Sequence, residues 1–313
     1  MLRIIFADGA DREVIEALQE NAHLSIETAR ALESQALQAA AFRCEMLVTR
    51  SWQSVDRGVL EAGRKGALRV VAQASAGLDN IDRSAAREMG LEILQIDPGN
   101  AVSVAELTIF SMIALLRNAR AHWRRSEAGG WPEREKVPDR ELRGRSVGLV
   151  GLGRVGTAVA SRAAAFDLRL LGIDPYVDEE HFTRLGVVRH ESLREMLSEC
   201  DILSLHCPLT DETRGMIDAS MLSRMPVGSF LINTARGPIV DSAALRNALD
   251  EGRLEGAAID VYPREPPGRS EVVMHEKVLP TPHIAGHTRD SHHRRGVEMT
   301  QAILAWVERE LQR

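Results

Sequence analysis

The segment of residues 147–156, VGLVGLGRVG, limits the fold of this chain more than any other segment. Its apolar half suits a buried parallel strand, and three glycines follow at the G-x-G-x-x-G spacing at which a helix would begin. In such a turn Gly151 allows the sharp exit from the strand, Gly153 lets a pyrophosphate approach bare backbone, and Gly156 lets the helix pack closely on its strand. The segment therefore predicts a strand, a phosphate-binding turn and a helix.

The residues that follow favour a dinucleotide as the ligand of this turn. The new helix would offer free N–H groups at Arg154 and Val155 to the phosphates. Residues 169–173 form the next expected strand, and Asp174 follows at close to the roughly twenty-residue offset at which a carboxylate meets a ribose 2′-hydroxyl. Glycines alone are weak evidence, because turns between strands and helices use glycine whatever they bind. The acidic residue and the strand context predict NAD, since a carboxylate there would repel the 2′-phosphate of NADP.

Length and composition predict a globular protein of two domains. The chain has 313 residues, against about 150 for an average domain, and its hydrophobic share of 44% is ordinary for such proteins. A formal net charge of −6 argues against nucleic-acid binding, and no apolar stretch approaches the roughly eighteen residues that cross a membrane. The three cysteines show neither a C-x-x-C pair nor a leader before them, which predicts the reducing cytoplasm.

The first hundred residues alternate short apolar runs with amphipathic segments, which predicts a small parallel α/β unit. The expected elements are strands at 2–7, 45–50, 69–75 and 91–96 and a helix at 12–19. No glycine fingerprint occurs in this half, so we expect it to hold a substrate. Its loop at residues 73–80 follows a strand, where open α/β sheets place ligands, although a plain turn is the alternative.

A long helix is expected at 102–123, after the break at Pro98-Gly99-Asn100. We expect it to bury an apolar face partly against a second subunit, which predicts a homodimer. The later strands are expected at 201–205, 228–233 and 256–260, and a last helix at 288–311. Residues at or just past the ends of these strands would gather at the ligand edge of the sheet, namely His206, Cys207, Pro208, Thr234, Ala235, Arg236 and Asp260.

Arg236, Glu265 and His283 form a set that suits hydride transfer between a 2-hydroxy acid and nicotinamide. The hydroxyl proton must move as well, and a histidine supported by a carboxylate can carry it. A guanidinium can bind the carboxylate and the carbonyl oxygen in one plane. Taken singly, each residue has an ordinary alternative: a helix-entry salt bridge, a solvated turn and a core histidine. Zinc held by His283 and His287 is disfavoured because no H-E-x-x-H motif is present, so we expect no metal.

With these residues in place, the chain resembles the D-isomer-specific 2-hydroxyacid dehydrogenases, most closely their phosphoglycerate dehydrogenase and hydroxypyruvate/glyoxylate reductase branches. The resemblance runs through nearly the whole chain, in the ordered motifs SAGLDNID, SVAEL, GLVGLGRVG, HCPLTDETRGMI, LINTARGPIVD, AAIDVYPREPP and TPHIAG. It implies two Rossmann-like α/β domains with doubly wound parallel sheets, of which the substrate-binding domain is discontinuous. That domain would comprise residues 1–100 and 284–313, and the NAD-binding domain residues 101–283.

The resemblance also implies roles for single residues. Arg236 would bind the substrate, His283 would act as acid and base, and Glu265 would be its partner. Substrate-binding residues would be Arg50, Ser75, Ala76 and Gly77, with the amides of the last two receiving the substrate carboxylate. Asp260 would hold the nicotinamide carboxamide. The expected cofactor-binding residues are Val104, Gly151, Gly153, Arg154, Val155, Gly156, Asp174, His206, Cys207, Pro208, Thr213, Thr234, Ala235, Asp260, His283 and Gly286.

Departures from the family pattern bear on the substrate. Phosphoglycerate dehydrogenases usually carry Arg-Ala-Gly in the substrate loop, where this chain has Gln73-Ala74-Ser75. The expected substrate is therefore a short 2-keto acid of the hydroxypyruvate or glyoxylate type, with Arg50 and His287 left as candidate partners of a phosphate. Because the chain ends without the regulatory domain of longer relatives, we expect no feedback by an amino acid. The alternative from another class is an NAD(H)-sensing binding protein, like the transcriptional corepressors of this family.

Overall fold

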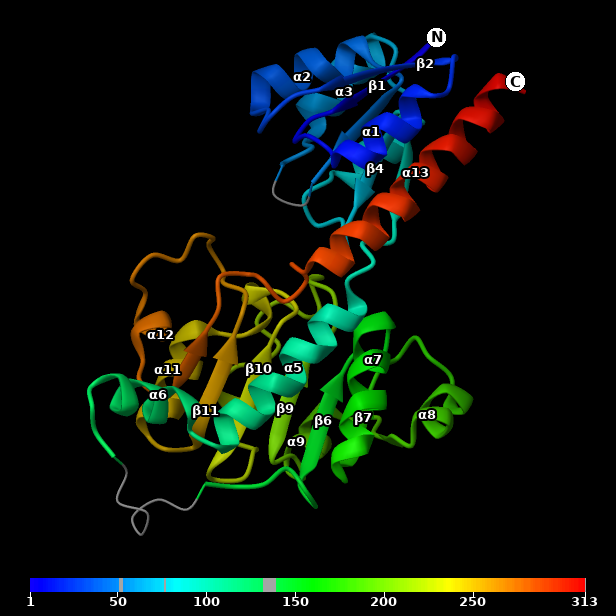
Figure 1. Cartoon of the computed structure of the whole chain (residues 1–313). Coiled ribbons are helices and arrows are strands. Elements are labelled where there is room, and N and C mark those ends of the chain that lie inside the picture. Colours follow the sequence, from blue (N-terminus) through cyan, green and yellow to red (C-terminus); the bar gives the residue numbers. More distant parts are fainter. Residues whose placement is uncertain (51–52, 76, 132–138, 313) are drawn as a thin grey trace. The chain divides into compact units, whose positions relative to one another are not determined.

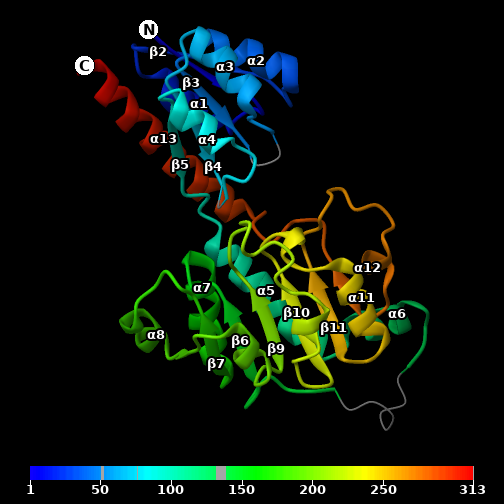
Figure 2. The ribbon, with the colours of Figure 1, turned by 180° about the vertical axis from the view of Figure 1, so that it is seen from behind.

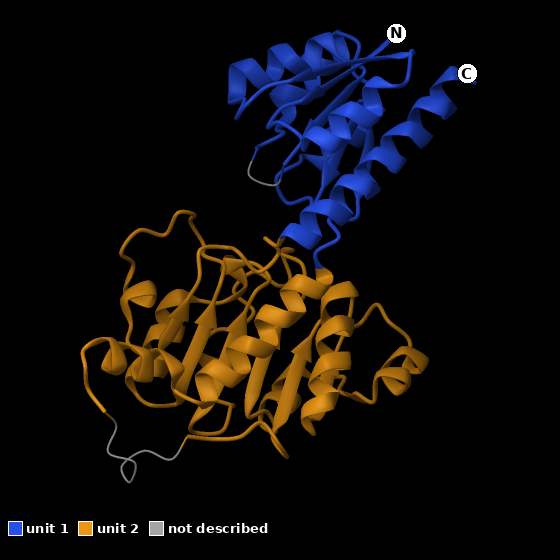
Figure 3. Ribbon diagram, viewed as in Figure 1, with its two compact units in different colours: residues 1–100, 289–313 blue, residues 101–288 orange. Residues whose placement is uncertain are grey.

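The computed structural model describes residues 1–50, 53–75, 77–131 and 139–312. The chain divides into two compact units, shown in Figure 3, which we describe separately. Unit 1 comprises Met1–Asn100 and Arg289–Arg313, and unit 2 comprises Ala101–Thr288. Each unit is built on one parallel sheet, of five strands in unit 1 and seven in unit 2. The prediction of two doubly wound α/β domains is therefore confirmed.

Unit 1 alternates strands and helices along the chain, and one further helix comes from the C-terminal segment (Figure 1). Its elements are β1 (Leu2–Phe6), α1 (Arg12–Gln19), β2 (Leu24–Thr28), α2 (Ser34–Arg43), β3 (Met46–Thr49), α3 (Arg57–Lys65), β4 (Val70–Ala74), α4 (Arg83–Glu88), β5 (Glu92–Ile96) and α13 (Arg289–Leu311).

The sheet of unit 1 has the strand order β2-β1-β3-β4-β5. Its order reverses between β1 and β3, and ligands of open α/β sheets bind past the carboxyl ends of the strands at such a point. The helices α2, α3 and α4 cover one face, and α1 and α13 cover the other. Ile303, Trp306 and Val307 of α13 are all buried in the same core as Ile4 and Phe6 of β1. The C-terminal segment therefore belongs to unit 1 because its apolar face completes that core.

Unit 2 contains the remaining elements, and the glycine-rich segment joins its strand β6 to its helix α7 as the sequence predicts. They are α5 (Ala101–Leu116), α6 (Ala119–Glu127), β6 (Ser146–Val150), α7 (Arg154–Ala163), the short helix η1 (Ala164–Phe166), β7 (Arg169–Ile173), α8 (Glu179–Leu185), β8 (Val188–Arg189), α9 (Leu193–Leu197), β9 (Ile202–Leu205), α10 (Ala219–Leu222), β10 (Ser229–Asn233), the short helix η2 (Gly237–Ile239), α11 (Ser242–Asp250), β11 (Leu254–Ile259), α12 (Glu271–Met274) and β12 (Val278–Pro280).

The seven-stranded sheet has the order β12-β11-β10-β9-β6-β7-β8, which reverses between β6 and β9. Helices cover both faces: α5 and α7 lie over one, as Figure 1 shows, and α11 lies over the other, as Figure 2 shows from behind. The central strands β6, β9 and β10 are buried along their whole length, which explains why they read as continuous apolar runs. This arrangement brings the ends of β6 and β9 together at the expected cofactor position.

The expectation of one helix at 102–123 is wrong, because the structure has two helices there. α5 ends at Leu116 and α6 begins at Ala119, with Asn118 between them in the left-handed conformation at φ +44°. Asparagine adopts this conformation more readily than most residues, so it can end a helix without a glycine or proline signal. Among the described residues no single helix is long and apolar enough to cross a membrane; α5 and α6 reach that length and composition only together, with a 71° bend between them.

Candidate functional site

The three glycines after β6 have three different environments. Gly151 has φ +93°, and an added Cβ would lie 2.8 Å from the backbone nitrogen of Cys207. At Gly156 an added Cβ would lie 2.0 Å from the Gly151 carbonyl oxygen, so only glycine lets α7 pack this close to the turn. By contrast, a Cβ at Gly153 would meet nothing within 4 Å. The first and third glycines are thus required by packing, and the second faces open space that a phosphate can occupy.

Asp174 is tied to this turn, as its expected role requires. Its Oδ2 accepts the N–H of Leu152 at 2.7 Å, and its Oδ1 accepts the N–H of Tyr176 at 2.9 Å. The carboxylate at the end of β7 therefore lies directly beside the loop between the first two glycines. This is where a ribose hydroxyl would lie if its pyrophosphate contacted Gly153. The residues present fit NAD.

His206 follows β9 on the other side of the reversal point. Its Nε2 lies 2.9 Å from the Ser204 hydroxyl, while its Nδ1 is shielded from solvent and has no partner among the described residues. Although part of the residue is exposed, burial of the ring lowers the pKa of His206 to about 3. The imidazole is neutral at physiological pH. Burial also raises the pKa of the neighbouring Cys207 thiol to about 11, so this sulfur is not a thiolate nucleophile.

The other expected cofactor residues of unit 2 divide into loop supports and buried helix positions. The Thr213 hydroxyl donates to the Pro208 carbonyl at 2.7 Å, which closes the loop after Cys207. Thr234 follows β10, where its hydroxyl lies 3.4 Å from that of Thr108 on α5. Val104 on α5 is only 5% exposed. Thr108 thus contacts the residue after β10.

Three neighbouring strands carry the expected catalytic residues. The strands β10, β11 and β12 are adjacent and parallel, so their carboxyl ends share one edge of the sheet. Arg236 follows β10, Glu265 lies in the loop after β11, and His283 follows β12. Residues that are 18 to 47 positions apart in the sequence therefore meet at one edge because of the strand order.

His283 and Glu265 form a hydrogen-bonded pair. His283 Nδ1 lies 2.6 Å from Glu265 Oε2, and the two side chains are 46% and 37% exposed. The other carboxylate oxygen, Oε1, accepts the N–H of Tyr262 at 2.9 Å, which fixes the direction of the glutamate. With Nδ1 directed at the carboxylate, Nε2 is the ring nitrogen left to exchange a proton with a ligand. This is the pairing that the sequence predicts.

Asp260 anchors the backbone on which His283 is carried. Its buried carboxylate accepts the N–H groups of Ile284 and Ala285, each at 2.9 Å, and the Thr281 hydroxyl at 2.6 Å. The N–H of His283 itself donates to the Asp260 carbonyl at 2.8 Å. His283 is held at φ +55°, a conformation that side-chain-bearing residues rarely adopt. The sequence assigns Asp260 to the cofactor and misses this anchoring role.

The loop of Arg236 packs against the loop that leads to Glu265. A Cβ at Gly237 would lie 2.0 Å from the backbone of Tyr262, so the contact requires glycine. Asn233 at the end of β10 holds the turn, since its side chain donates to the Arg236 carbonyl at 3.0 Å and accepts the Ala235 N–H at 3.0 Å. The cation and the carboxylate–histidine pair are thus carried on loops that touch.

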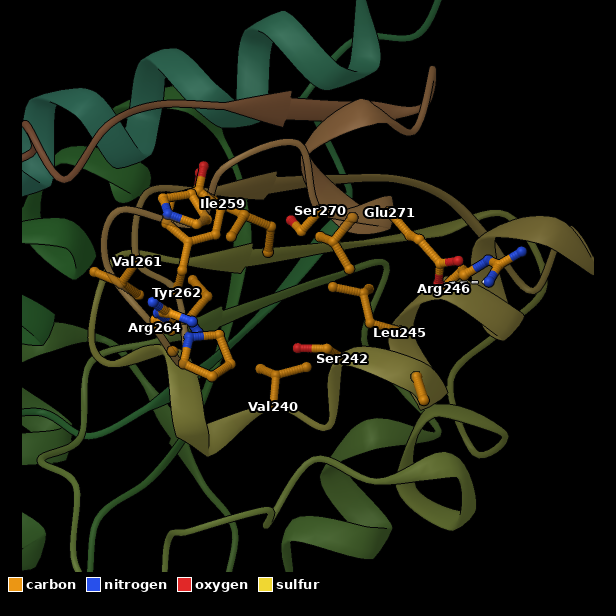
Figure 4. A pocket seen from close by; sticks show the side chains of 16 residues that line it. Val240, Ser242, Leu245, Arg246, Ile259, Val261, Tyr262, Arg264, Ser270 and Glu271 are labelled. Atoms are coloured by element: carbon orange, nitrogen blue, oxygen red, sulfur yellow. Dashed lines mark hydrogen bonds and ion pairs between the residues drawn. The ribbon is translucent and has the colours of Figure 1, made fainter.

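A cavity of about 520 Å³ borders these loops, between β11, α11 and α12. Its walls are mostly apolar, and Figure 4 shows Val261, Tyr262 and Arg264 across the cavity from Arg246 and Glu271. Arg246 and Glu271 form an ion pair at 2.5 Å. None of the three expected catalytic residues lines this cavity. It lies beside these loops and does not hold the candidate site.

In unit 1 the expected substrate loop is held by Gln73. This side chain is fully buried; its Oε1 accepts from the Thr49 hydroxyl at 3.1 Å, and its Nε2 donates to the Gly77 carbonyl at 3.0 Å and to Asn80 Oδ1 at 2.9 Å. The Ser75 hydroxyl is also engaged, with the Gly77 carbonyl. Gln73 and Ser75 therefore shape the loop from inside. Ala76 lies outside the described residues.

Arg50 lies past the end of β3, beside the point where the strand order of unit 1 reverses. Its guanidinium forms an ion pair with Asp8 at 3.2 Å. Arg295 of α13 lies close enough for its pKa to be lowered by burial and by the charge of Arg50, and it pairs with Asp11 at 3.6 Å. Two guanidinium groups and two carboxylates thus share this end of the sheet.

In the part of the chain that the structure describes, no group of three or more His, Cys, Asp or Glu could hold a metal ion.

Comparison with known protein families and sequences gives consistent matches. Residues 109–285 match the model of the D-isomer specific 2-hydroxyacid dehydrogenase, NAD binding domain. The chain is 33% identical to the hydroxypyruvate reductase of Thermotoga maritima over 96% of this chain and 97% of that protein. It is also 33% identical to the D-3-phosphoglycerate dehydrogenase of Methanocaldococcus jannaschii over 97% of this chain. The chain spans only 57% of the length of that second relative.

Among solved structures, the chain is similar to a D-lactate dehydrogenase from Aquifex aeolicus in complex with NAD and lactic acid. The TM-score is 0.85 at 27% sequence identity, and the match covers 99% of this chain and 96% of that one. The similarity therefore extends through both units.

Proposed function

Because the chain belongs to the D-isomer specific 2-hydroxyacid dehydrogenase family, we propose that it is an enzyme that interconverts a small D-2-hydroxy acid and its 2-keto acid with NAD. The family resemblance that the motifs predict is confirmed, and so is an NAD-binding domain within unit 2. The observation that carries the proposal is the 2.6 Å pair of His283 and Glu265 on the same sheet edge as Arg236. The division into a substrate-binding part, residues 1–100 and 284–313, and an NAD-binding part, residues 101–283, belongs to the same proposal.

The residues have complementary roles in reduction of the keto acid. NADH, when bound, supplies the hydride. Arg236 binds the carboxylate and the carbonyl oxygen in one plane, which orients the carbonyl carbon. His283 donates its Nε2 proton to that oxygen, and Glu265 holds the ring by its Nδ1–H and stabilises the protonated imidazole. In the reverse direction His283 removes the hydroxyl proton.

The loop at residues 73–80 of unit 1 also belongs to the proposal. We assign the Ala76 and Gly77 amides to the substrate carboxylate, with Ser75 and Gln73 supporting the loop from within. The remaining expected cofactor contacts, including Arg154, Val155 and Gly286, complete the NAD site.

The substrate is a short polar keto acid such as hydroxypyruvate or glyoxylate. A phosphate at the far end of the substrate would need cations to bind it. At the loop position where longer relatives carry arginine, this chain has Gln73, which is fully buried. Its amide forms hydrogen bonds with Thr49, Gly77 and Asn80. Arg50 is the remaining candidate cation, but it is paired with Asp8.

Steady-state oxidation of NADH with hydroxypyruvate, glyoxylate and phosphohydroxypyruvate tests this assignment. We expect kcat/KM for one of the first two to exceed that for the phosphorylated acid at least tenfold, about 1.4 kcal/mol of transition-state binding. If phosphohydroxypyruvate is the best substrate, the assignment fails, and Arg50→Ala should then lose that substrate selectively.

A homodimer is part of the proposal. Its support is a patch of exposed apolar side chains on α5 and α6, in which Phe110 is 44%, Ile113 37% and Trp123 50% exposed, and the rings of Phe110 and Trp123 stack at 6.4 Å. Exposed clusters of this kind commonly mark interfaces. Sedimentation at micromolar concentration should give the mass of two chains, and Ile113→Asp should shift it towards one. A wild-type protein with the mass of one chain would contradict the homodimer.

We place the enzyme in the cytoplasm, supported by three cysteines that are all unpaired.

A further inference from the structure

His181, on α8, contacts the loop between the first two glycines. Its Nε2 lies 3.0 Å from the Leu152 carbonyl oxygen and 3.0 Å from the Thr157 hydroxyl. That hydroxyl also donates to the Leu152 carbonyl, at 2.9 Å. The carbonyl of Leu152 is thus held by two side chains from different helices. No sequence motif points to this contact, because His181 lies 29 positions from Leu152.

Arg184 determines which ring nitrogen of His181 carries the proton. Its guanidinium lies 2.6 Å from His181 Nδ1. A guanidinium can only donate hydrogen bonds, so Nδ1 must accept, and the proton of the neutral ring must be on Nε2. His181 therefore donates its Nε2–H towards Leu152, and the arginine fixes the tautomer that does so.

The orientation of the Leu152 carbonyl determines the direction of the next N–H group. The C=O of Leu152 and the N–H of Gly153 belong to one trans peptide, in which they point in opposite directions. Holding the carbonyl towards α8 therefore directs the Gly153 N–H away from α8. Gly153 is the glycine with open space around it, where we place the pyrophosphate. The preceding peptide is held as well, because Asp174 accepts the Leu152 N–H at 2.7 Å.

We infer that His181 is a positioning residue for the cofactor: it donates Nε2–H to the Leu152 carbonyl in the tautomer set by Arg184, and so fixes the phosphate-binding turn for NADH. The inference rests on the proposed function, because it assumes that this turn binds NADH. The side chain is placed to act through the backbone and not on the reacting atoms. Its loss should therefore weaken cofactor binding while leaving the chemical step at saturating cofactor nearly unchanged.

The test compares the affinity for NADH, measured by fluorescence titration, with kcat at saturating NADH. His181→Ala should raise the Kd about fivefold to tenfold, the loss of one hydrogen bond and its ordering effect, with kcat within about twofold of wild type. His181→Gln carries an amide N–H near the position of Nε2–H and should recover most of the affinity. The control is His275→Ala, in which a histidine paired with Asp250 at 3.2 Å is removed from the same unit; it should leave the Kd unchanged.

The outcomes separate the inference from the proposed function. If the wild-type protein does not bind NADH, the proposed function falls, and this inference falls with it. If wild type binds NADH and His181→Ala binds it equally well, or if His181→Gln is as weak as His181→Ala, only the inference is overturned. A lower melting temperature of His181→Ala with an unchanged Kd would show a purely structural role. Nitrogen chemical shifts of the His181 ring give an independent readout: the Nε2–H tautomer is expected, and the Nδ1–H tautomer contradicts the assignment to Arg184.

Discussion

Glu265 Oε2 lies 2.6 Å from His283 Nδ1, while the other oxygen of the same carboxylate is held by the backbone of Tyr262. The carboxylate is therefore held in a fixed position to accept a hydrogen bond from His283 Nδ1, and Nε2 is left to contact a ligand. Because Asp260 binds three groups of the loop on either side of His283, the histidine is fixed through its backbone as well as through its ring. Contacts within unit 2 therefore orient the pair.

Replacement of His283 should remove proton transfer without unfolding the loop. We choose His283→Asn because asparagine tolerates the left-handed backbone found at this position. The expected loss is roughly 10² to 10⁴ in kcat for keto-acid reduction, measured at saturating NADH. His293→Asn, which changes a histidine that pairs with Glu13 on unit 1, is the control and should keep full activity. A variant at His283 with wild-type kcat would contradict the acid–base role.

Glu265→Gln should lower kcat for keto-acid reduction, because a neutral amide no longer stabilises the protonated imidazole that donates the proton. The glutamine oxygen can still accept the Tyr262 N–H, so the loop should be kept. We expect a loss of about tenfold or more, measured as kcat at saturating NADH and keto acid. A variant with wild-type kcat would mean that the observed pairing does not operate during turnover.

Asp174 should make the enzyme prefer NADH over NADPH by at least about tenfold in kcat/KM, since its carboxylate would repel a 2′-phosphate. Asp174→Asn removes the charge and keeps an oxygen that can accept the Leu152 N–H, although the Tyr176 N–H loses its acceptor. In the variant the ratio of kcat/KM for NADH to kcat/KM for NADPH should be smaller, mainly because KM for NADPH is lower. Asp167→Asn, at an exposed residue paired with Arg143, should leave the preference unchanged. Equal use of both cofactors by wild type would overturn the role of Asp174.

His206 should make the protein less stable in acid. Burial lowers the folded-state pKa of His206 to about 3 from an ordinary value of 6.5, so below about pH 6.5 the unfolded chain takes up a proton that the folded chain excludes. Stability is lost as pH falls between these values, by at most about 1.4 kcal/mol per pH unit from this group. His206→Gln removes this dependence while keeping a donor for Ser204. Thermal unfolding at pH 7 and pH 4.5 should therefore show a smaller decrease in melting temperature for the variant; an equal decrease would contradict the buried neutral imidazole.

Much of the cofactor half was predictable because its signals are local. The spacing of Gly151, Gly153 and Gly156 requires a strand, a turn and a helix, and the structure gives each glycine its own physical reason. The strand at 169–173 and its terminal Asp174 were predicted from a short apolar run ended by an acid. The fold class followed from the same alternation of strands and helices.

Other features depend on tertiary contacts that the sequence does not display. Gln73 lies in β4, a strand that is buried along almost its whole length. The pattern of apolar residues in such a strand does not indicate which residues the amide of Gln73 contacts. The edge strand β2 (Leu24–Thr28) was not among the expected elements, because its polar and half-buried residues form no apolar run. The helix break at Asn118 lacks a glycine or proline signal. Asp260 anchors groups up to 25 positions away, a distance over which no spacing rule operates.

Transfer of deuterium from the cofactor to the substrate shows whether this protein moves a hydride between NADH and a keto acid. The protein is incubated with hydroxypyruvate or glyoxylate and NADH deuterated at the transferable position, and the product is analysed by mass spectrometry, with His283→Asn as the control. We expect wild type to form a 2-hydroxy acid that carries deuterium at C2, and the variant to form it at least about a hundredfold more slowly. Tight binding of NADH without deuterium in any 2-hydroxy acid, across these keto acids and phosphohydroxypyruvate, would contradict it and would indicate a protein that senses the dinucleotide.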